Sequence, residues 1–131
     1  MYMKILVVEP GKHPYEKEIE CTLKEMQKIV GGRIQTLYPF RDEVGVVCND
    51  DGISLQMPFN RKIDEECYIF GTFFLCGLGL EDFTSLPENL MEKYRKRFYS
   101  PQIYTASGVY NLPPERYRLL MVKLGELEGR A

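Results

Sequence analysis

The sequence lacks several features that define common classes of protein. Its 131 residues contain no apolar run near the ~20 residues that cross a membrane, and the run from Ile5 to Val8 is too short for a secretory signal. Neither sign of charge is in excess, because 17 basic and 19 acidic residues leave a net charge of −2. This balance argues against a general nucleic-acid binder and against an acidic DNA mimic. We expect a cytoplasmic protein without a membrane partner.

Motifs for nucleotide binding and nucleophilic catalysis are also missing. Gly77-Leu78-Gly79 lacks the third glycine and the helix start of a dinucleotide fingerprint, and Gly11-Lys12 lacks the upstream glycine and following Ser/Thr of a P-loop. No nucleophile elbow is present. The four cysteines, none of them in a C-x-x-C pair, are Cys21, Cys48, Cys67 and Cys76. We expect reduced, mostly buried thiols, no metal and no cofactor.

The most apolar stretch runs from Tyr68 to Leu80 and carries no charge. Because alternate residues of a strand point to opposite faces, both faces of this stretch are apolar. That pattern predicts an interior strand covered on two sides, and Gly71 and Gly77 disfavour the competing interpretation of a buried helix. With 44% hydrophobic residues, the chain should fold as one domain around this strand.

Hydrophobic periodicity predicts a helix from Pro14 to Val30, ended by Gly31-Gly32. Its inner stripe consists of Tyr15, Ile19, Leu23, Met26 and Val30. Strands are predicted at 3–8, 33–38 and 44–49, with a short fourth at 53–57. Residues 58–66 read as a polar connection that leads into the central strand.

The second half of the chain contains two more predicted helices. Ser85 and Glu88 have the spacing of a capping box, and Pro87 suits a first turn. The inner stripe of this helix consists of Leu86, Leu90, Met91, Tyr94 and Phe98. Residues 100–112 show no period and are predicted as a loop, before a last helix that begins at Pro113-Pro114. The stripe of that helix consists of Tyr117, Leu120, Met121 and Leu124.

These elements predict an α+β fold with a small mixed β-sheet of four to five strands, in the order β-α-β-β-β-β-α, and two or three amphipathic helices. We expect the first two strands to be parallel, joined by a right-handed crossover through the helix. Residues 1–98 would form the core α+β domain. Residues 99–131 would form a C-terminal loop and helix that pack on the same domain.

Five short motifs, in order along the chain, resemble a bacterial and phage family known as domain of unknown function 3846. They are Met3–Gly11 (MKILVVEPG), Leu37–Phe40 (LYPF), Val46–Asn49 (VVCN), Met57–Arg61 (MPFNR) and Gly71–Phe74 (GTFF). The resemblance covers roughly residues 3 to 98 and carries no catalytic residues. It implies an accessory role in a phage, plasmid or conjugative element, by association alone.

Asn60 and Arg61 are the first candidate site. They interrupt apolar sequence just before the central strand, and the guanidinium fork suits a carboxylate or phosphate. The alternative is a structural arginine that pairs with Asp64, Glu65 or another acid.

Glu9, His13 and Asp82 form a second candidate site, because Glu9 and Asp82 end two predicted strands. If those strands were parallel and adjacent, the three side chains would meet at one edge of the sheet and could bind metal or move protons. Ordinary solvated charges at strand ends are the alternative.

A basic cluster closes the second predicted helix and is the candidate anion-binding site. It consists of Lys93, Arg95, Lys96 and Arg97. A helix macrodipole favours cations in its last turn, but four within five residues exceed that need. Acids near in sequence lie too far along the helix to neutralise them. We expect at most weak, salt-sensitive contact with nucleic acid.

Two function hypotheses remain. The first is a non-enzymatic binding or interaction module with an unknown protein partner, acting as a monomer or homodimer. The second is a small enzyme or ligand-binding protein that uses a cleft at Glu9, His13 and Asp82, or at Arg61. One concave pocket that gathers these residues would favour the second hypothesis, and scattered positions would favour the first.

Overall fold

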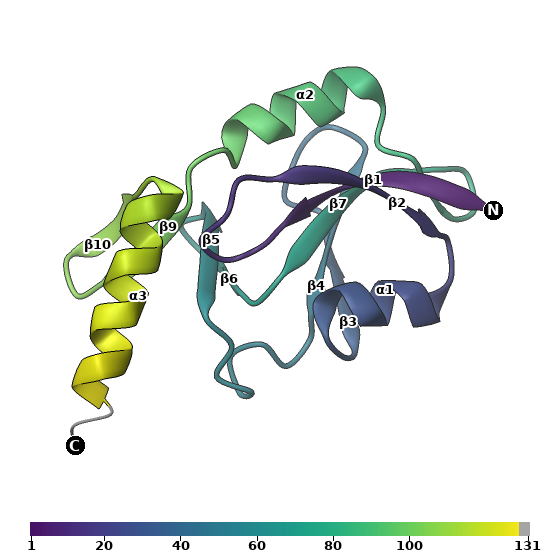
Figure 1. Cartoon of the computed structure of the whole chain (residues 1–131). Coiled ribbons are helices and arrows are strands. Elements are labelled where there is room, and N and C mark those ends of the chain that lie inside the picture. Colours follow the sequence, from purple (N-terminus) through teal and green to yellow (C-terminus); the bar gives the residue numbers. More distant parts are fainter. Residues whose placement is uncertain (129–131) are drawn as a thin grey trace.

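The structure is a computed structural model that describes the backbone of residues 1–128 and the side chains of residues 1–125 (Figure 1). The elements are β1 (Tyr2–Val8), β2 (Tyr15–Glu20), α1 (Leu23–Val30), β3 (Ile34–Leu37), β4 (Val44–Asn49), β5 (Phe59–Asp64), β6 (Cys67–Phe70), β7 (Phe73–Leu78), β8 (Phe83–Thr84), α2 (Glu88–Arg97), β9 (Gln102–Thr105), β10 (Gly108–Asn111) and α3 (Pro114–Glu128). The predicted α+β class is confirmed. No helix within residues 1–128 is long and apolar enough to cross a membrane.

The main sheet has the strand order β2-β1-β7-β4-β3, and β8 pairs with the end of β7. Every pair in it is antiparallel. The parallel arrangement expected for strands 3–8 and 33–38 is wrong, because β7 and β4 separate β1 from β3. The chain leaves β1 through a hairpin into β2, so no crossover helix forces two parallel strands.

The centre of this sheet is β7, and its two faces carry two cores. Phe73 and Leu75 point to the face that α2 covers, whereas Phe74 and Cys76 point to the face that α1 covers. All four side chains are fully buried. The predicted interior strand is therefore confirmed for residues 73–78, and burial of each large side chain stabilises the fold by roughly 1.5–3 kcal/mol.

The predicted central strand is divided at Gly71. Gly71 has φ +88°, and a Cβ on it would lie 2.6 Å from the sulfur of Met57, so only glycine fits this turn. Before the turn, β6 pairs with β5 in a separate two-stranded sheet whose residues Ile63 and Ile69 join the core under α2. The polar connection predicted at 58–66 is wrong, since most of it is strand β5.

The helix predicted from Pro14 to Val30 is wrong in its first half, which forms β2. In β2 only Ile19 is buried, and exposed charged side chains line this edge strand, an arrangement that discourages pairing with another chain. The helix starts after Thr22, whose side chain accepts a hydrogen bond from the backbone N–H of Glu25 at 3.2 Å. The stop at Gly31 is confirmed, with φ 79° at the C-cap.

Of the remaining expectations for secondary structure, the stripe of α2 is confirmed, and the strand at 53–57, the loop at 100–112 and the Ser85 cap are wrong. Residues 53–57 form turns rather than a strand, and residues 102–111 form the β9–β10 hairpin rather than a loop. The stripe of α2 is confirmed, with Met91 and Tyr94 buried. Ser85 does not cap α2, because its hydroxyl accepts a hydrogen bond from the backbone N–H of Lys4 at 2.9 Å.

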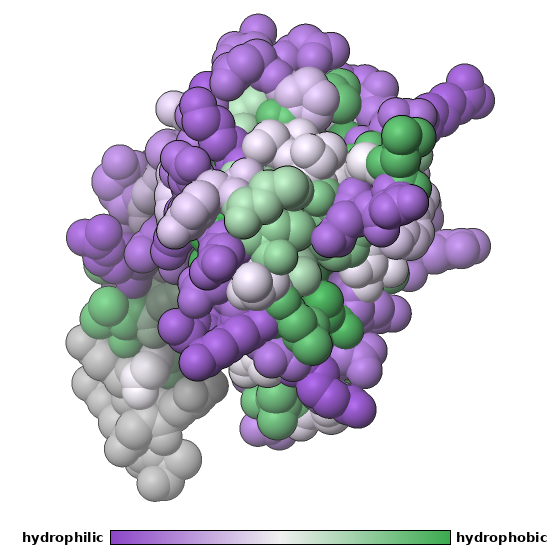
Figure 2. Space-filling view, turned by 90° about the vertical axis from the view of Figure 1, so that its right-hand side faces the viewer, coloured by the Kyte–Doolittle hydropathy of each residue, from purple (hydrophilic) through white to green (hydrophobic). Residues whose placement is uncertain are grey.

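The molecule has two unlike ends. Figure 1 shows α3 and the β9–β10 hairpin at one end, and α1, β2 and the N-terminus at the other. On the second end, which faces the viewer in Figure 2, hydrophilic side chains surround a central apolar area. The first end carries α3, on which Leu119, Met121, Val122 and Leu124 are exposed.

Candidate functional site

Arg61, on β5, is fully buried and its guanidinium is fully used. Nε and Nη2 donate to the carbonyl of Phe98 at 3.3 and 2.9 Å, and Nη2 also donates to the carbonyl of Lys12 at 2.7 Å. Nη1 donates to the carbonyl and the side-chain oxygen of Asn60 at 3.4 and 2.9 Å. These five bonds match its five N–H donors, so no donor remains for a ligand.

The acceptors around Arg61 are all neutral oxygens, so the expected pairing with Asp64 or Glu65 is wrong. Burial without a carboxylate partner lowers the pKa of Arg61 to about 10. Since this pKa still lies far above 7, the side chain stays charged. Its role is to hold together the loop after β1, strand β5 and the C-terminal end of α2.

Asn60 completes this arrangement, and we call the two residues the Asn60–Arg61 clamp. The Asn60 Nδ2 donates to the carbonyls of Val8 and Gly71, both at 2.8 Å, while its oxygen accepts from Arg61. The clamp therefore joins the end of β1 to the turn between β6 and β7. A buried, fully satisfied network of this kind specifies geometry and leaves no group to bind substrate.

Glu9, His13 and Asp82 do not form one site. Glu9 follows β1 and Asp82 follows β7. Because these neighbouring strands are antiparallel, their C-terminal ends lie at opposite ends of the strands in the sheet. His13 instead stacks on Tyr99 with ring centroids 4.0 Å apart, and its Nδ1 lies 2.6 Å from the Tyr99 carbonyl. Within the described residues, no group of three His, Cys, Asp or Glu side chains can hold a metal ion.

The basic cluster of α2 is neutralised by acids distant in sequence. Lys93 contacts Asp42 at 2.6 Å, and Arg95 contacts Glu16 at 2.7 Å. Hydrogen bonds from Lys93 and then from the Tyr94 hydroxyl hold the pKa of Asp42 below its usual value. The expectation that the cluster carries excess positive charge is wrong, because Asp42 and Glu16 reach it from other elements of the fold.

The two remaining members of the cluster are also engaged. Lys96 lies 3.6 Å from Glu92, a partner on the same helix face. Arg97 donates to the carbonyl of Ile63 at 2.8 Å and lies over the ring of Phe40, 4.9 Å from its centroid. The cluster thus braces α2 against the loop after β3 and against β5, which supports the structural interpretation.

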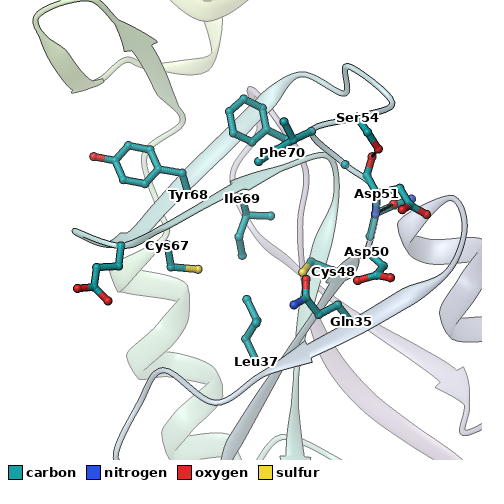
Figure 3. A pocket seen from close by; sticks show the side chains of 14 residues that line it. Gln35, Leu37, Cys48, Asp50, Asp51, Ser54, Cys67, Tyr68, Ile69 and Phe70 are labelled. Carbon is teal, nitrogen blue, oxygen red and sulfur yellow. Dashed lines mark hydrogen bonds between the residues drawn. The ribbon is translucent and has the colours of Figure 1, made fainter.

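Sequence reasoning missed a cavity of about 500 Å³ between β3 and β4 on one side and β6 on the other (Figure 3). Cys48 and Cys67 point into it from opposite walls, and Asp50 lies at its border. Burial is the main cause that raises the pKa of Cys48 to about 11, and burial also raises the pKa of Cys67. Both thiols therefore stay protonated near pH 7 and are not activated nucleophiles.

The lining of this cavity shares no residue with the candidate sites. It consists of Gln35, Leu37, Cys48, Asn49, Asp50, Asp51, Gly52, Ile53, Ser54, Glu66, Cys67, Tyr68, Ile69 and Phe70. The cavity left no local signal in the sequence, because its walls come from three segments that lie far apart along the chain, 33–38, 44–49 and 67–70. Only the fold of the β5–β6 hairpin over the sheet creates this space.

The C-terminal end carries an apolar groove of about 400 Å³ between α3 and the β5 and β9 strands. Its walls include Phe59, Ile103, Leu120 and Leu124, and none of the lining residues within 1–125 is charged. The helix is seated by Tyr117, whose ring lies so close to Gly11 that a Cβ there would collide with it. Gly11, at φ +76°, is therefore needed for this contact.

The opposite side of α3 exposes more apolar surface. Leu119 and Val122 lie off the predicted stripe and are 56% and 53% exposed. Met121 and Leu124, on the groove side, are still 38% and 42% exposed. We call the apolar residues of this end the C-terminal surface; they are Tyr104, Tyr110, Leu119, Met121, Val122 and Leu124.

Taken together, these features define a small α+β domain with a buried polar clamp and with scattered, individually engaged polar candidates. The chain belongs to a family described as Domain of unknown function (DUF3846), whose family model matches residues 3–99. This match confirms the resemblance and extends from β1 to the end of α2, so β9, β10 and α3 lie beyond it. No curated protein and no solved structure matches the chain.

Proposed function

We propose that this protein is a non-enzymatic interaction module that binds another protein through its C-terminal surface. The scattered positions of Glu9, His13 and Asp82 support a binding role over catalysis. The complete use of the Arg61 donors supports it as well. A catalytic site would need these groups to converge on one substrate atom.

The single observation that carries this proposal is the exposure of α3. A helix that is apolar on two sides is normally covered on two sides. Here the groove side of α3 faces the protein, but Leu119 and Val122 on the other side are more than half exposed. Contiguous exposed apolar surface of this kind marks protein interaction sites.

The setting we propose is the cytoplasm of a bacterium that carries a phage, plasmid or conjugative element. The family resemblance supports the mobile element by association. All four cysteines are free thiols in the structure, which fits a reducing compartment. The partner would then be a host or mobile-element protein that occurs in the same compartment.

Site-specific photo-crosslinking in the native host tests this function. We expect Leu119→p-benzoyl-phenylalanine to form a covalent adduct with one defined protein, because that position would lie in the interface. The same replacement at exposed Lys24, on α1 at the other end of the molecule, is the matched control and should give no such adduct. Identical adducts at both positions, or none at position 119, would contradict the proposal.

The cavity between β3, β4 and β6 supports a second candidate function, the binding of a small ligand. Its volume of about 500 Å³ is typical of ligand pockets, and its lining mixes apolar and polar groups. Gln35→Trp would fill the cavity from its exposed border. A metabolite that raises Tm of the parent protein but not of Gln35→Trp would support this function, and a full screen without such a compound would remove it.

A further inference from the structure

The two edge strands of the main sheet differ in charge. At one edge, β2 carries Glu16, Lys17, Glu18 and Glu20 among its six residues. At the other edge, β3 has the sequence Ile-Gln-Thr-Leu and carries no charge. Charged side chains on an edge strand discourage another strand from pairing with it. One edge of the sheet is therefore protected by charge, and the β3 edge is not.

The backbone of β3 leaves hydrogen-bonding groups open to this edge. The Arg33 carbonyl accepts a hydrogen bond from the backbone N–H of Asp50 at 2.8 Å, which fixes the alternation along the ladder with β4. The N–H and C=O groups of Ile34 and Thr36 therefore point away from β4. Within residues 1–128, these groups form no backbone hydrogen bond. We call Ile34 and Thr36 the open edge.

The cavity between β3, β4 and β6 lies beside the open edge. Gln35 and Leu37 alternate with the open-edge residues along β3, and both line the cavity (Figure 3). Because Gln35 is exposed, β3 forms an exposed border of this space. Opposite residues of a β-ladder point to the same face. A strand paired with β3 would therefore place one side chain next to Gln35 on the cavity side.

The interior of the cavity suits an aromatic ring. The thiols of Cys21 and Cys76 donate to carbonyls at 3.6 and 3.8 Å. Cys48 and Cys67, which point into the cavity, form no hydrogen bond among the described residues, and Cys48 is 5% exposed. Sulfur atoms make favourable contacts with aromatic rings. The charged residues of the described lining are all acids, which disfavours an acidic side chain in the same place.

An extended peptide matches both features. The outward groups of Ile34 and Thr36 recur at roughly 6.6–6.8 Å, which is the repeat of alternate residues in an extended chain. A helix uses its backbone groups internally and does not offer this repeat. We propose that an extended segment of a partner protein pairs with β3 and inserts one aromatic side chain beside Gln35 into the cavity. This site is separate from the C-terminal surface, and the inference does not rest on it.

A second copy of this chain fits the open edge less well. Two β3 strands could pair across a two-fold axis. The side chains that each would offer to the other, Gln35 and Leu37, already line their own cavity. Since β3 has four residues, backbone pairing alone should be weak, and affinity should depend on the inserted ring.

A pair of synthetic peptides tests the inference with the full chain. Each is a short, end-blocked peptide of alternating threonine and serine, with phenylalanine at the centre of one and aspartate at the centre of the other. In an NMR titration at about 0.15 M salt, the phenylalanine peptide should shift the amide signals of Ile34 and Thr36. The aspartate peptide should bind at least about tenfold more weakly, because burial of the ring is lost. Equal affinities, or no saturable shift up to about 1 mM peptide, would overturn the inference.

A third peptide separates strand pairing from simple filling of the cavity. It keeps the phenylalanine but carries N-methyl groups on the two residues beside it, which removes the N–H donors to the carbonyls of Ile34 and Thr36. We expect binding at least about tenfold weaker than that of the parent peptide. Unchanged binding would assign the cavity to a free aromatic ligand, as in the second candidate function, and would overturn the inference.

Matched protein variants locate the site. Thr36→Pro removes an outward N–H without removing a bond to β4, and it should weaken the phenylalanine peptide at least about tenfold. The backbone N–H of Cys21 donates to the Met1 carbonyl at 2.8 Å, so the N–H of Glu18 also points outward. Glu18→Pro is therefore the control at the other edge and should leave binding unchanged. Equal effects of the two prolines would overturn the inference.

Two further measurements complete the test. Gln35→Trp should remove the preference for phenylalanine over aspartate, because the indole occupies the cavity, and this variant decides the question if Thr36→Pro does not fold. A preference that survives Gln35→Trp would contradict the inference. Sedimentation that shows a dimer broken by Thr36→Pro would assign the open edge to a second copy and overturn the proposal of a partner peptide.

Discussion

The strand β7 and the helix α3 both carry large apolar side chains, but the surroundings of these side chains are opposite. Phe73 and Phe74 are fully buried because α2 and α1 cover the two faces of the sheet. Leu119 and Val122 are more than half exposed, since no described element covers the outer side of α3. The comparison shows that the part of the chain that matches the family closes its own core, whereas the described segment beyond residue 99 leaves large apolar side chains exposed.

The largest expected effect is at the centre of the core. Phe73→Asp should lower the free energy of unfolding by several kcal/mol, at least about 4, because it buries an unpaired charge and removes an aromatic side chain. Denaturant melts measure this loss directly. If the variant does not fold at all, Phe73→Leu should still cost about 1 kcal/mol or more. A loss within about 0.5 kcal/mol would place Phe73 at the surface.

The second effect concerns the Asn60–Arg61 clamp. Arg61→Met keeps the apolar stem but removes the donors to the buried carbonyl of Phe98 and the partly buried carbonyl of Lys12, and we expect a loss of about 2–4 kcal/mol. Lys96→Met, at an exposed position on α2, is the control and should change stability by less than about 0.5 kcal/mol. Equal stability of the two variants would show that the clamp does not hold the core together.

Some of this fold was predictable from local patterns, and the reasons differ by element. The strand at 73–78 and the inner stripe of α2 were predicted correctly, because in both segments the spacing of apolar residues matches the side that the fold buries. The stretch Tyr15 to Ile19 fits a helical stripe and an edge strand equally well, and only the hairpin with β1 decides between them. Thr22 and Glu25 have the spacing of a capping box, a signal for the true helix start that our prediction of a helix from Pro14 did not use.

The Asn60–Arg61 clamp and the cavity between β3, β4 and β6 could not be predicted from local sequence patterns. The acceptors of Arg61 are carbonyls of residues 12, 60 and 98, which the fold brings together from distant segments. No spacing rule encodes such a site. The exposure of Leu119 and Val122 was also beyond local patterns, because it depends on which side of the helix Tyr117 fixes against Gly11.

The third effect is a dependence on pH that comes from buried thiols. Burial raises the pKa of Cys48 to about 11 and of Cys76 to about 12. Below pH 8.5, about the pKa of a thiol in the unfolded chain, the folded and the unfolded protein both keep the thiol proton, so the thiols do not lower the free energy of unfolding. Above that pH, the thiols ionise in the unfolded chain but stay protonated in the folded protein. The free energy of unfolding should therefore fall as the pH rises toward the folded-state pKa, by about 1 kcal/mol per thiol at pH 9.5.

Chemical denaturation between pH 7 and 9.5 measures this slope. Cys48→Ala with Cys76→Ala removes the two most strongly shifted thiols and should make the slope shallower. Under denaturing, non-reducing conditions, thiol titration should count all four free thiols. A slope unchanged by the two substitutions would show that these thiols are not the cause, and two missing thiols would reveal a disulfide.

The fourth expected effect is a small change in stability at the exposed side of α3. Leu119→Ser with Val122→Ser should change the free energy of unfolding by less than about 0.5 kcal/mol per site, because both side chains are mostly exposed already. The same melts used for Phe73→Asp provide the value. A loss above about 2 kcal/mol would mean that Leu119 and Val122 support the fold rather than bind a partner.

The smallest effect concerns nucleic acid. Since Lys93 and Arg95 already pair with Asp42 and Glu16, binding to a labelled duplex or single strand should be salt-sensitive and vanish near about 0.15 M salt. Fluorescence anisotropy measures it. Tight binding that persists at that salt, and that Arg95→Glu with Lys96→Glu abolishes, would turn this helix end into a nucleic-acid site.

Amide hydrogen exchange on the full chain, read by mass spectrometry, tests the contrast between core and C-terminal surface most directly. We predict that β7 amides exchange only when the whole domain unfolds, while α3 amides around Leu119 and Val122 exchange through local opening. The protection of α3 should then be lower by several orders of magnitude, and a bound partner protein should raise it. Equal protection of α3 and β7 in the free protein would contradict the account, because α3 would then be part of the core.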